Sequence, residues 1–404
     1  MRMTQPARQR DGGGSVAEVF GAFLKLGCTS FGGPIAHLGY FRSELVVRRR
    51  WIDERAYGEL VGLSQFLPGP ASSQVGFALG LMRAGPFGGL AAWAAFTLPS
   101  AMVMFLVARF AADLSGRVGT AAIHGLEIAA VAIVAQALFG MARALTPDLR
   151  RIAIAGAAAA MTLAVTLPAA QIAIIVLGGV AGLALCPTKT VTSAPTPSWN
   201  AGRLASLWYL AIYGLLLLLL LLVGPRGDLL ALAGTFYRAG ALVFGGGHVV
   251  LPLLHASLVP DWISDSAFLT GYGAVQAMPG PLFTFSAYLG AIALPETPMA
   301  GAAIALLAIF MPGLLMVAAA LPFRATIASH HRAQSAIAGV NASVVGILAA
   351  SLYDPLWKSG IGSLQDVAIV LASIGLLTRF RAPPIAIVGF AVAASLVLAV
   401  VISP

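Results

Sequence analysis

The chain has 404 residues, of which 59% are hydrophobic and 10% are charged. A soluble domain carries about 25% charged residues, so this composition excludes a soluble nucleotide-binding module, a secreted enzyme and a DNA-binding domain. The formal net charge of +9 does not indicate nucleic acid as a partner, because the basic residues lie scattered at segment ends, where they orient helices and meet anionic lipid. The sequence predicts a polytopic protein embedded in the lipid bilayer.

The N-terminal fifteen residues are polar and basic, and the apolar residues 16–38 lack a small-residue cleavage site. We therefore expect no removable signal peptide. Cys28 and Cys186 match neither a disulfide framework nor a metal-ligand spacing, and both are expected to fill apolar space. Because the sequence shows no metal site, no redox-cofactor ligand set and no nucleophile motif, we expect a protein that has no cofactor and is not an enzyme.

Charges and Gly/Pro punctuation divide the chain into about thirteen apolar segments, nearly all long enough to be membrane helices. In chain order they are residues 16–38, 57–82, 87–112, 119–141, 152–167, 169–185, 204–223, 229–255, 268–294, 299–322, 333–353, 361–377 and 384–402. The polar stretch 187–203 is the linker-like piece between two halves. We expect an all-α membrane protein with an N-terminal repeat in residues 1–190, a linker and connecting helix in 191–227, and a C-terminal repeat in 228–404.

The two halves are copies of one another. Residues 23–33 overlay residues 236–246 at an offset of 213, and residues 51–70 overlay residues 262–281 at an offset of 211. The second window matches Trp51 to Trp262 and places a Pro-Gly-Pro at the same distance after each tryptophan. Apolar composition alone does not produce such a match, so the sequence predicts an internal duplication.

Charge predicts that the two copies face opposite sides of the membrane. The connection 39–56 holds five arginines and should be cytoplasmic, whereas its counterpart 256–267 holds Asp261 and Asp265 and neither Lys nor Arg. Two arrangements of the first segment stay open. If residues 16–38 cross the membrane, the N-terminal arginines lie outside; if they form a re-entrant segment broken at residues 32–34, these arginines return to the cytoplasm.

Each half holds two interruptions within stretches long enough to span a membrane: a glycine cluster at residues 32–33 or 245–247, and a Pro-Gly-Pro at 68–70 or 279–281. Proline removes a backbone donor and glycine admits any backbone angle, so continuous helices through these points are not expected. Unwound backbone at membrane depth lies in protein or in a water-filled cavity, and a restarting helix offers free N–H groups. Matched interruptions in inverted halves indicate a transport site, although kinks that relieve packing are the alternative.

Polar residues around the interruptions suggest an anion as the substrate. Lys25 and Arg238 occupy equivalent positions, and a pair of symmetric cations suits an anion, unless both side chains snorkel to the membrane surface. Hydroxyls and amides beyond the breaks suit oxyanion oxygens, although single Ser or Thr residues in membrane helices often bond their own backbone. The candidate substrate-binding residues are Lys25, Gly32, Gly33, Gln65, Pro68, Gly69, Pro70, Ser72, Ser73, Gln74, Arg238, Gly245, Gly246, Gly247, His248, Gln276, Pro279, Gly280, Pro281 and Thr284.

Two further residues are candidates for proton coupling. His37 follows the first glycine cluster, and Glu127 is a carboxylate within an apolar segment. A structural role for the histidine, and an ion pair of Glu127 with an arginine such as Arg109 or Arg143, are the alternatives.

The motifs themselves resemble those of the chromate ion transporter family in its two-domain, long-chain form. The resemblance lies in FGGPIAHLGYFR (31–42), RRRWIDE (48–54), QFLPGPASSQVG (65–76), RAG (83–85), FTLPSA (96–101), FGGGHVVLPLL (244–254) and GYGAVQAMPGPLFTFSAYLG (271–290). The family's motif residues carry over to 31–42, Trp51, 65–74, Arg83, 244–252 and 271–288.

The resemblance implies a bacterial inner-membrane protein that exports chromate, a tetrahedral dianion, and confers chromate resistance without reducing it. Sulfate differs little from chromate in size, charge and shape, so transport of sulfate or another tetrahedral oxyanion stays an alternative. An anion channel and a membrane-embedded chromate reductase are alternatives from other classes. No interface is visible in the sequence, and a homodimer is conceivable.

Overall fold

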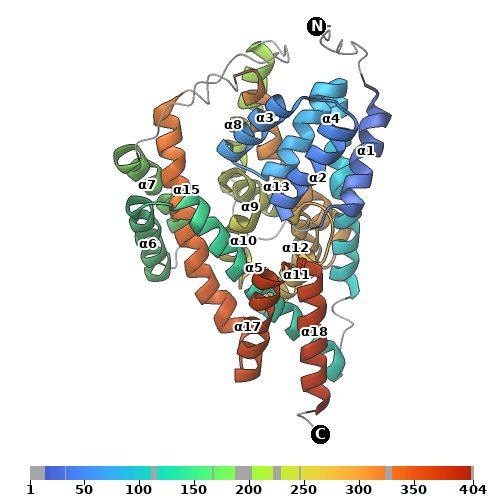
Figure 1. The fold of residues 1–404 in the computed structure, drawn as a ribbon, viewed down its shortest axis with the longest axis vertical. Helices are drawn as coiled ribbons and strands as arrows, with labels where there is room; N and C mark the ends of the chain where they lie inside the picture. The colour runs from blue at the N-terminus through green and yellow to red at the C-terminus, as the bar shows by residue number, and fades with distance from the viewer. Residues whose placement is uncertain are drawn as a thin grey trace, which may run out of the picture.

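The computed structural model describes residues 14–31, 33–110, 116–165, 168–186, 203–221, 229–244, 247–323 and 330–401. Every regular element in these ranges is a helix (Figure 1), which confirms the expected all-α membrane fold. Four helical stretches are long and apolar enough to cross a membrane: Ala71–Phe110, Arg117–Leu145, Pro298–Phe323 and His331–Gly360. Shorter apolar helices accompany them, and several of these are arms of hairpins that turn back inside the protein.

The first hairpin consists of α1 (Val16–Thr29), α2 (Gly33–Phe41) and the π-helical turn η1 (Arg42–Arg48). With 14 residues, α1 is about 21 Å long and falls short of the roughly 30 Å hydrocarbon core. The chain then returns beside α1, because Trp51 Nε1 donates to Glu18 Oε1 at 3.1 Å and the rings of Phe23 and Phe41 lie 5.5 Å apart. The first segment is therefore re-entrant, the second of the two arrangements that the sequence left open.

A second hairpin follows, made of α3 (Glu54–Phe66) and the first part of α4 (Ala71–Phe110). Its second arm ends next to the start of α1, where the Gly14 N–H donates to the Arg83 carbonyl at 3.1 Å and the Arg83 guanidinium lies 3.2 Å from Glu18 Oε2. The backbone of α4 then leaves helical geometry at Ala84 and at Gly85, whose φ is +68°. The rest of α4 runs back along the hairpin from this turn and is long enough to cross the membrane.

The second half repeats this arrangement from the other side. It contains, in chain order, α9 (Leu229–Leu242), η3 (Gly247–Val249), α10 (Val250–Leu258), α11 (Asp265–Gln276), η4 (Leu282–Thr284), α12 (Phe285–Ala293), α13 (Pro298–Ala320) and η5 (Leu321–Phe323). Gly290 packs against Gly301 as Gly80 packs against Gly88 in the first half. In Figure 1, α1, α2 and α3 lie in the upper half, whereas α11 and α12 lie below them. The repeats are inverted, as predicted.

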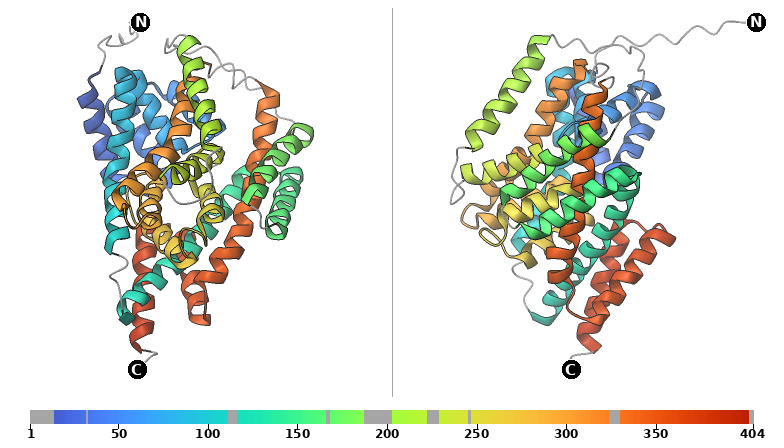
Figure 2. Two further views of the ribbon diagram at one scale, coloured as in Figure 1. Left: turned by 180° about the vertical axis from the view of Figure 1, so that it is seen from behind. Right: turned by 90° about the vertical axis from the view of Figure 1, so that its left-hand side faces the viewer.

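The outer helices exchange partners between the halves. From the first half, α5 (Gly116–Leu145) packs against α17 (Leu364–Arg379) and α18 (Pro384–Val401) of the second. From the second half, α15 (His331–Ser351) packs against α6 (Leu149–Ala164) and α7 (Pro168–Leu185) of the first. Figure 2 shows α6 and α7 in green beside α15 at mid-height, with the red helices of the C-terminal part at the bottom of the molecule. Each half is therefore completed by helices of the other.

The remaining described helices connect these parts. The helix α8 (Arg203–Leu221) packs against α9 and α13, and η6 (Leu352–Trp357) and α16 (Lys358–Gly360) extend α15 toward α17. Cys186 is buried, as expected, whereas Cys28 lies exposed on the surface of α1. The proposed boundaries of the two halves at residues 190 and 228 stay predictions.

Close helix contact at Gly290 predicts a stability effect. A Cβ atom there would meet the Gly301 carbonyl, whereas a Cβ atom at Gly58 on α3 would meet nothing within 4 Å. We expect Gly290→Ala to destabilise the full chain by about 1–3 kcal/mol through overpacking, and Gly58→Ala to leave its stability unchanged or slightly raised, since alanine is the better helix former. Thermal unfolding of both variants in detergent measures this difference, and equal midpoints would contradict the packing described.

Candidate functional site

The tips of the hairpins meet one another through two equivalent hydrogen bonds. The Gly69 N–H of the first Pro-Gly-Pro donates to the Val243 carbonyl at 2.7 Å, and the Gly280 N–H of the second donates to the Ser30 carbonyl at 2.8 Å. The donors are related by the repeat offset of 211 and the acceptors by the offset of 213. The Pro-Gly-Pro tip of each half is thus bonded to the broken helix of the other half.

Glycine is required where these tips approach. Gly69 and Gly280 have φ values of +121° and +91°, which side chains rarely tolerate. A Cβ atom on Gly69 would lie 2.7 Å from Gly313 Cα, and one on Gly280 would lie 2.9 Å from Ser100 Oγ. The glycine clusters meet as well, because a Cβ atom on Gly247 would lie 3.4 Å from Pro34 Cγ.

The breaks of both halves therefore converge, as the sequence led us to expect. Gly33 is another glycine with a positive φ, +78°, at the start of α2. The candidates Gly32, Gly245 and Gly246 lie outside the described residues.

Buried polar atoms without partners gather on the elements that form the tips. Within the described part of the chain, the potential donors of this kind on these elements include Ser30 Oγ, His37 Nε2, Ser64 Oγ, Ser73 Oγ, Thr97 Oγ1 and Gln276 Nε2, and α4 also carries Arg83 Nε and Trp93 Nε1. Burying a donor without a partner costs about 1–3 kcal/mol, so such groups normally bind water or a ligand. The hydroxyl, imidazole and amide groups among them suit the oxygens of an anion.

In the first half, His37 and the first turn of α4 lie together. His37 Nδ1 is 3.4 Å from Ser72 Oγ, and its ring meets Phe96 edge-on with 5.3 Å between the centroids. Ser72 and Ser73 stand in the first helical turn after Pro70, where backbone N–H groups have no intrahelical partner. Imidazole, hydroxyl and main-chain donors are thus placed at one helix N-terminus.

Gln74 holds the first Pro-Gly-Pro in place. Its Nε2 donates to the Pro68 carbonyl at 2.8 Å and to the Gly313 carbonyl at 3.0 Å. Both amide protons are therefore used within the protein, and Gln74 joins the tip of the first half to α13 of the second. Gln74 was predicted to bind the substrate, but its contacts show that it positions the tip.

In the second half, a tyrosine that the sequence analysis missed connects two candidates. His248 Nδ1 lies 2.5 Å from the Tyr272 hydroxyl, and Tyr272 stands four residues before Gln276 on α11. The spacing of four residues between Tyr272 and Gln276 on one helix face could have indicated this pair. The Thr284 hydroxyl donates to the Pro281 carbonyl at 2.9 Å, so its proton is used within its own turn, and Gln65 is exposed on α3.

The two symmetric cations are engaged elsewhere. Lys25 Nζ lies 3.1 Å from Glu44 Oε2, while Arg238 donates to the Leu220 carbonyl at 2.9 Å. Glu44 also binds Arg48 and Arg49. Burial disfavours the charged carboxylate, but hydrogen bonds from these arginines and from Lys25 outweigh it and lower the pKa of Glu44 to about 2.

The Lys25–Glu44 contact could not be predicted from local sequence, because its partners are 19 residues apart. No Lys or Arg is among the fully buried residues of the described chain. The tips therefore present neutral donors and helix ends instead of fixed positive charges.

Glu127 has partners other than the arginines considered from sequence. Its Oε1 accepts a hydrogen bond from Ser266 Oγ at 2.6 Å, and its Oε2 lies 3.5 Å from His124 Nδ1. Arg143 instead stacks on the ring of Phe139, 4.4 Å from the centroid. Glu127 thus lies at the base of the α11–α12 hairpin and away from the tips.

These features are those of a membrane transporter with inverted repeats, whose re-entrant hairpins meet at a cluster of polar groups. Residues 17–183 and 230–397 match the family described as Chromate transporter, so the chain belongs to that family. A chromate transport protein of Pseudomonas aeruginosa is 29% identical over 84% of this chain and 81% of its own length. A probable chromate transport protein of Synechococcus elongatus is 29% identical over 88% of this chain and 86% of its own.

A shorter relative matches a single half. The uncharacterized transporter YwrA of Bacillus subtilis is 29% identical over 37% of this chain, which is 85% of its own length. That coverage agrees with the duplication seen here. No solved structure matches the chain.

The Glu44 cluster generates a prediction with a defined sign in pH. We expect Glu44→Gln to destabilise the chain by about 2 kcal/mol at neutral pH, since three cations lose their counter-charge but remain partly screened by solvent. The pKa of Glu44 is lowered from 4.5 to about 2, so this contribution is present above pH 4.5 and disappears as the pH falls toward 2. Thermal unfolding of wild type and variant across this range measures it.

The exposed pair Arg42–Glu54 supplies the control. Arg42→Gln should cause a smaller loss of stability than Glu44→Gln. An equal loss in the two variants would contradict the role given to Glu44.

Proposed function

We propose that this protein exports chromate from the cytoplasm across the bacterial inner membrane by alternating access and thereby confers chromate resistance. The observation that carries the proposal is the meeting of re-entrant hairpins from two inverted halves, joined by the Gly69–Val243 and Gly280–Ser30 hydrogen bonds. Unpartnered donors surround this meeting point. The chromate transport proteins similar to this chain support chromate as the substrate.

A tetrahedral dianion fits the chemistry of the tips. In the proposed complex, free N–H groups at the start of α4 and of η4–α12 face the oxygens, and the positive ends of these helices favour negative charge. Ser73, Thr97 and Gln276 supply further donors that have no partner in the structure. Neutral donors replace the hydration shell of the anion without holding it as tightly as fixed cations would, which permits release.

The paired geometry suits alternating access. Each Pro-Gly-Pro tip is bonded to the opposite half, so a movement of one pair of hairpins relative to the other changes both hydrogen bonds together. With the arginine-rich connection 39–56 in the cytoplasm, the first pair of hairpins gates the inner side and the second pair the outer side. An inside-negative potential favours exit of an anion by about 2.3 kcal/mol per charge per 100 mV.

The alternatives are a carrier for sulfate or another tetrahedral oxyanion, and an anion channel. Competition by sulfate against chromate flux in liposomes containing the purified protein separates the substrates: equal inhibition by equal concentrations would favour a general oxyanion carrier. Counterflow separates the mechanisms, since a carrier accelerates labelled chromate uptake when unlabelled chromate is present on the other side. Flux that rises linearly with concentration without exchange would contradict the carrier.

Removal of one tip hydroxyl provides a residue-level test. We expect Ser73→Ala to raise the KM for chromate about 10- to 100-fold, because a hydrogen bond to a charged ligand contributes about 1.5–3 kcal/mol. Ser257→Ala is the control, since that hydroxyl donates to the Leu253 carbonyl of its own helix at 2.8 Å. Chromate uptake into inverted vesicles measures both, and an unchanged KM in Ser73→Ala would remove this residue from the site.

A further inference from the structure

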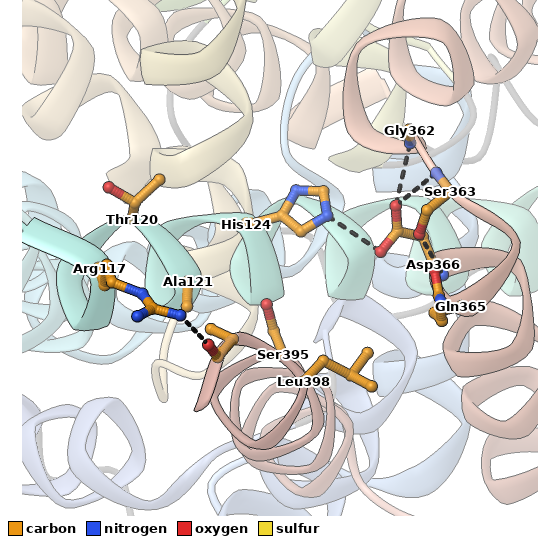
Figure 3. Close-up of a pocket in the computed structure, with 11 residues that line it drawn as sticks. Arg117, Thr120, Ala121, His124, Gly362, Ser363, Gln365, Asp366, Ser395 and Leu398 are labelled. Atoms are coloured by element: carbon orange, nitrogen blue, oxygen red, sulfur yellow. Dashed lines mark hydrogen bonds and ion pairs between the residues drawn. The ribbon is translucent and has the colours of Figure 1, made fainter. Parts of the chain in front are cut away.

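A second polar cluster lies at the base of the α11–α12 hairpin, away from its Pro-Gly-Pro tip. The side chain of His124 projects from α5 between two carboxylates: its Nε2 is 3.0 Å from Asp366 Oδ1 on α17, and its Nδ1 is 3.5 Å from Glu127 Oε2. Figure 3 shows the ring and Asp366 facing each other along one wall of a pocket. In the described residues, no group of His, Cys, Asp and Glu side chains is arranged to hold a metal ion.

The cluster connects three helices. Ser266, the second residue of α11, donates its hydroxyl proton to Glu127 Oε1 at 2.6 Å. Asp366 is fixed by the backbone N–H groups of Gly362 and Ser363 at 3.0 and 2.9 Å. Glu127 and Asp366 are both buried. The His124 ring is therefore the central link between the start of α17, α5 and the base of the α11–α12 hairpin.

Charges on the neighbouring elements are engaged in other contacts. Arg117, which also lines the pocket, donates to a main-chain carbonyl of α18 at 2.8 Å. Asp265 on α11 pairs with His255 at 2.6 Å, and Lys358 on α16 pairs with Asp354 at 2.5 Å. The helix α18 carries no charged residue, and the charged residues of α15, His331 and Arg332, stand in its first turn. The two carboxylates are thus the charged groups in contact with the His124 ring.

The other half of the molecule lacks this chemistry. Residues of α5 align with those of α15 at an offset of 214, which matches Gly125 to Gly339. Residues of α6 align with those of α17 at an offset of 215, which matches the N-cap residue Asp148 to the N-cap residue Ser363. The positions of His124, Glu127 and Asp366 are then occupied by Ala338, Asn341 and Arg151. The duplicated scaffold carries a histidine between carboxylates in one half alone.

We propose that His124, together with Glu127 and Asp366, is a proton-binding site that is coupled to anion binding at the tip of the same hairpin. The proposal deepens the transport function proposed above and rests on it. A protonated ring attracts both carboxylates and so holds α17 against α5, to which Ser266 is joined through Glu127; a neutral ring leaves two carboxylates with less to attract them. The twelve residues of α11, about 18 Å in length, connect this base to Gln276 at the tip.

Coupling between the two sites is reciprocal. If the proton and the anion favour different positions of the hairpin, protonation changes the affinity for chromate by the same factor as chromate changes the affinity for the proton. Such factors are typically about 5- to 150-fold. The α11–α12 hairpin beside this cluster belongs, by the proposed orientation, to the pair of hairpins that gates the outer side.

Calorimetric titration of sodium chromate into the full-length protein in lipid nanodiscs tests the coupling. The titration is run at about pH 6 and about pH 8, where histidine changes charge, and in two buffers of different ionisation enthalpy to count the protons exchanged. For each protein we compare the ratio of the chromate Kd values at the two pH values. We expect this ratio to be at least about 5-fold larger in the wild type than in His124→Gln. Chromate takes up a proton itself in this range, but all variants share that contribution.

The control variants make the outcome unambiguous. His255→Gln removes the other histidine–carboxylate contact of the hairpin and should keep the wild-type pH dependence. Asp366→Asn keeps an oxygen for the N–H groups of Gly362 and Ser363 and should lose the pH dependence as His124→Gln does. A wild-type pH dependence and proton count in His124→Gln would overturn the proposal, as would their loss in His255→Gln alone.

A measurement without anion separates this proposal from the transport function. The thermal midpoint of the wild type should rise from about pH 8 to about pH 6 relative to that of His124→Gln, because the protonated ring holds α17 against α5. An identical pH dependence of the two midpoints would overturn the proton site even if chromate binds. Absence of chromate binding to the wild type at both pH values would instead reject the proposed function.

Discussion

Backbone N–H and C=O groups at membrane depth need partners inside the protein, and this constraint governs how the molecule is arranged. Four helices are broken within the apolar part of the chain, and each break frees such groups. The two halves satisfy them for one another, with Gly69 donating to Val243 and Gly280 to Ser30. Because the partners come from opposite halves, neither repeat can complete its own tips. The exchange of α5 and α15 between the halves extends the same dependence to the outer helices.

Much of this fold can be predicted from the sequence, because composition, repetition and helix-breaking residues are local properties. They indicate the membrane class, the duplication, the positions of the breaks and, through charge, the inversion. The path of the chain after each break is not local. Whether an arm crosses or returns depends on contacts such as those of Glu18 with Trp51 and Arg83, which join residues far apart in sequence. The exchange of outer helices leaves no pattern within one helix and could not be foreseen.

For the candidate site, the residues that are repeated in both halves could be found from sequence, whereas contacts made in one half alone could not. Comparison of the halves directs attention to the tips, where Ser73 and Gln276 have unpartnered polar atoms. The comparison of the halves was less informative for side chains whose partners are distant in sequence or that occur in one half alone. Lys25 is engaged by Glu44, and His124 was missed because Ala338 stands at its position in the other half. An inverted duplication indicates where a shared binding site is to be sought, whereas the features that distinguish the two halves lie where the copies differ.

The meeting of the hairpin tips around the anion is tested most directly by a disulfide across it. A Cβ atom at Gly247 would lie 3.4 Å from Pro34 Cγ, which is bonded to Pro34 Cβ, so cysteines at the two positions come close to the roughly 3.5–4.5 Å between Cβ atoms that a disulfide needs. The pair Pro34→Cys with Gly247→Cys is made in a chain whose Cys28 and Cys186 are replaced by serine, and cross-linking is followed in membranes with and without chromate. The account predicts rapid cross-linking that blocks transport and that chromate slows. No cross-link in a folded protein, or one formed at the same rate with saturating chromate, would contradict it.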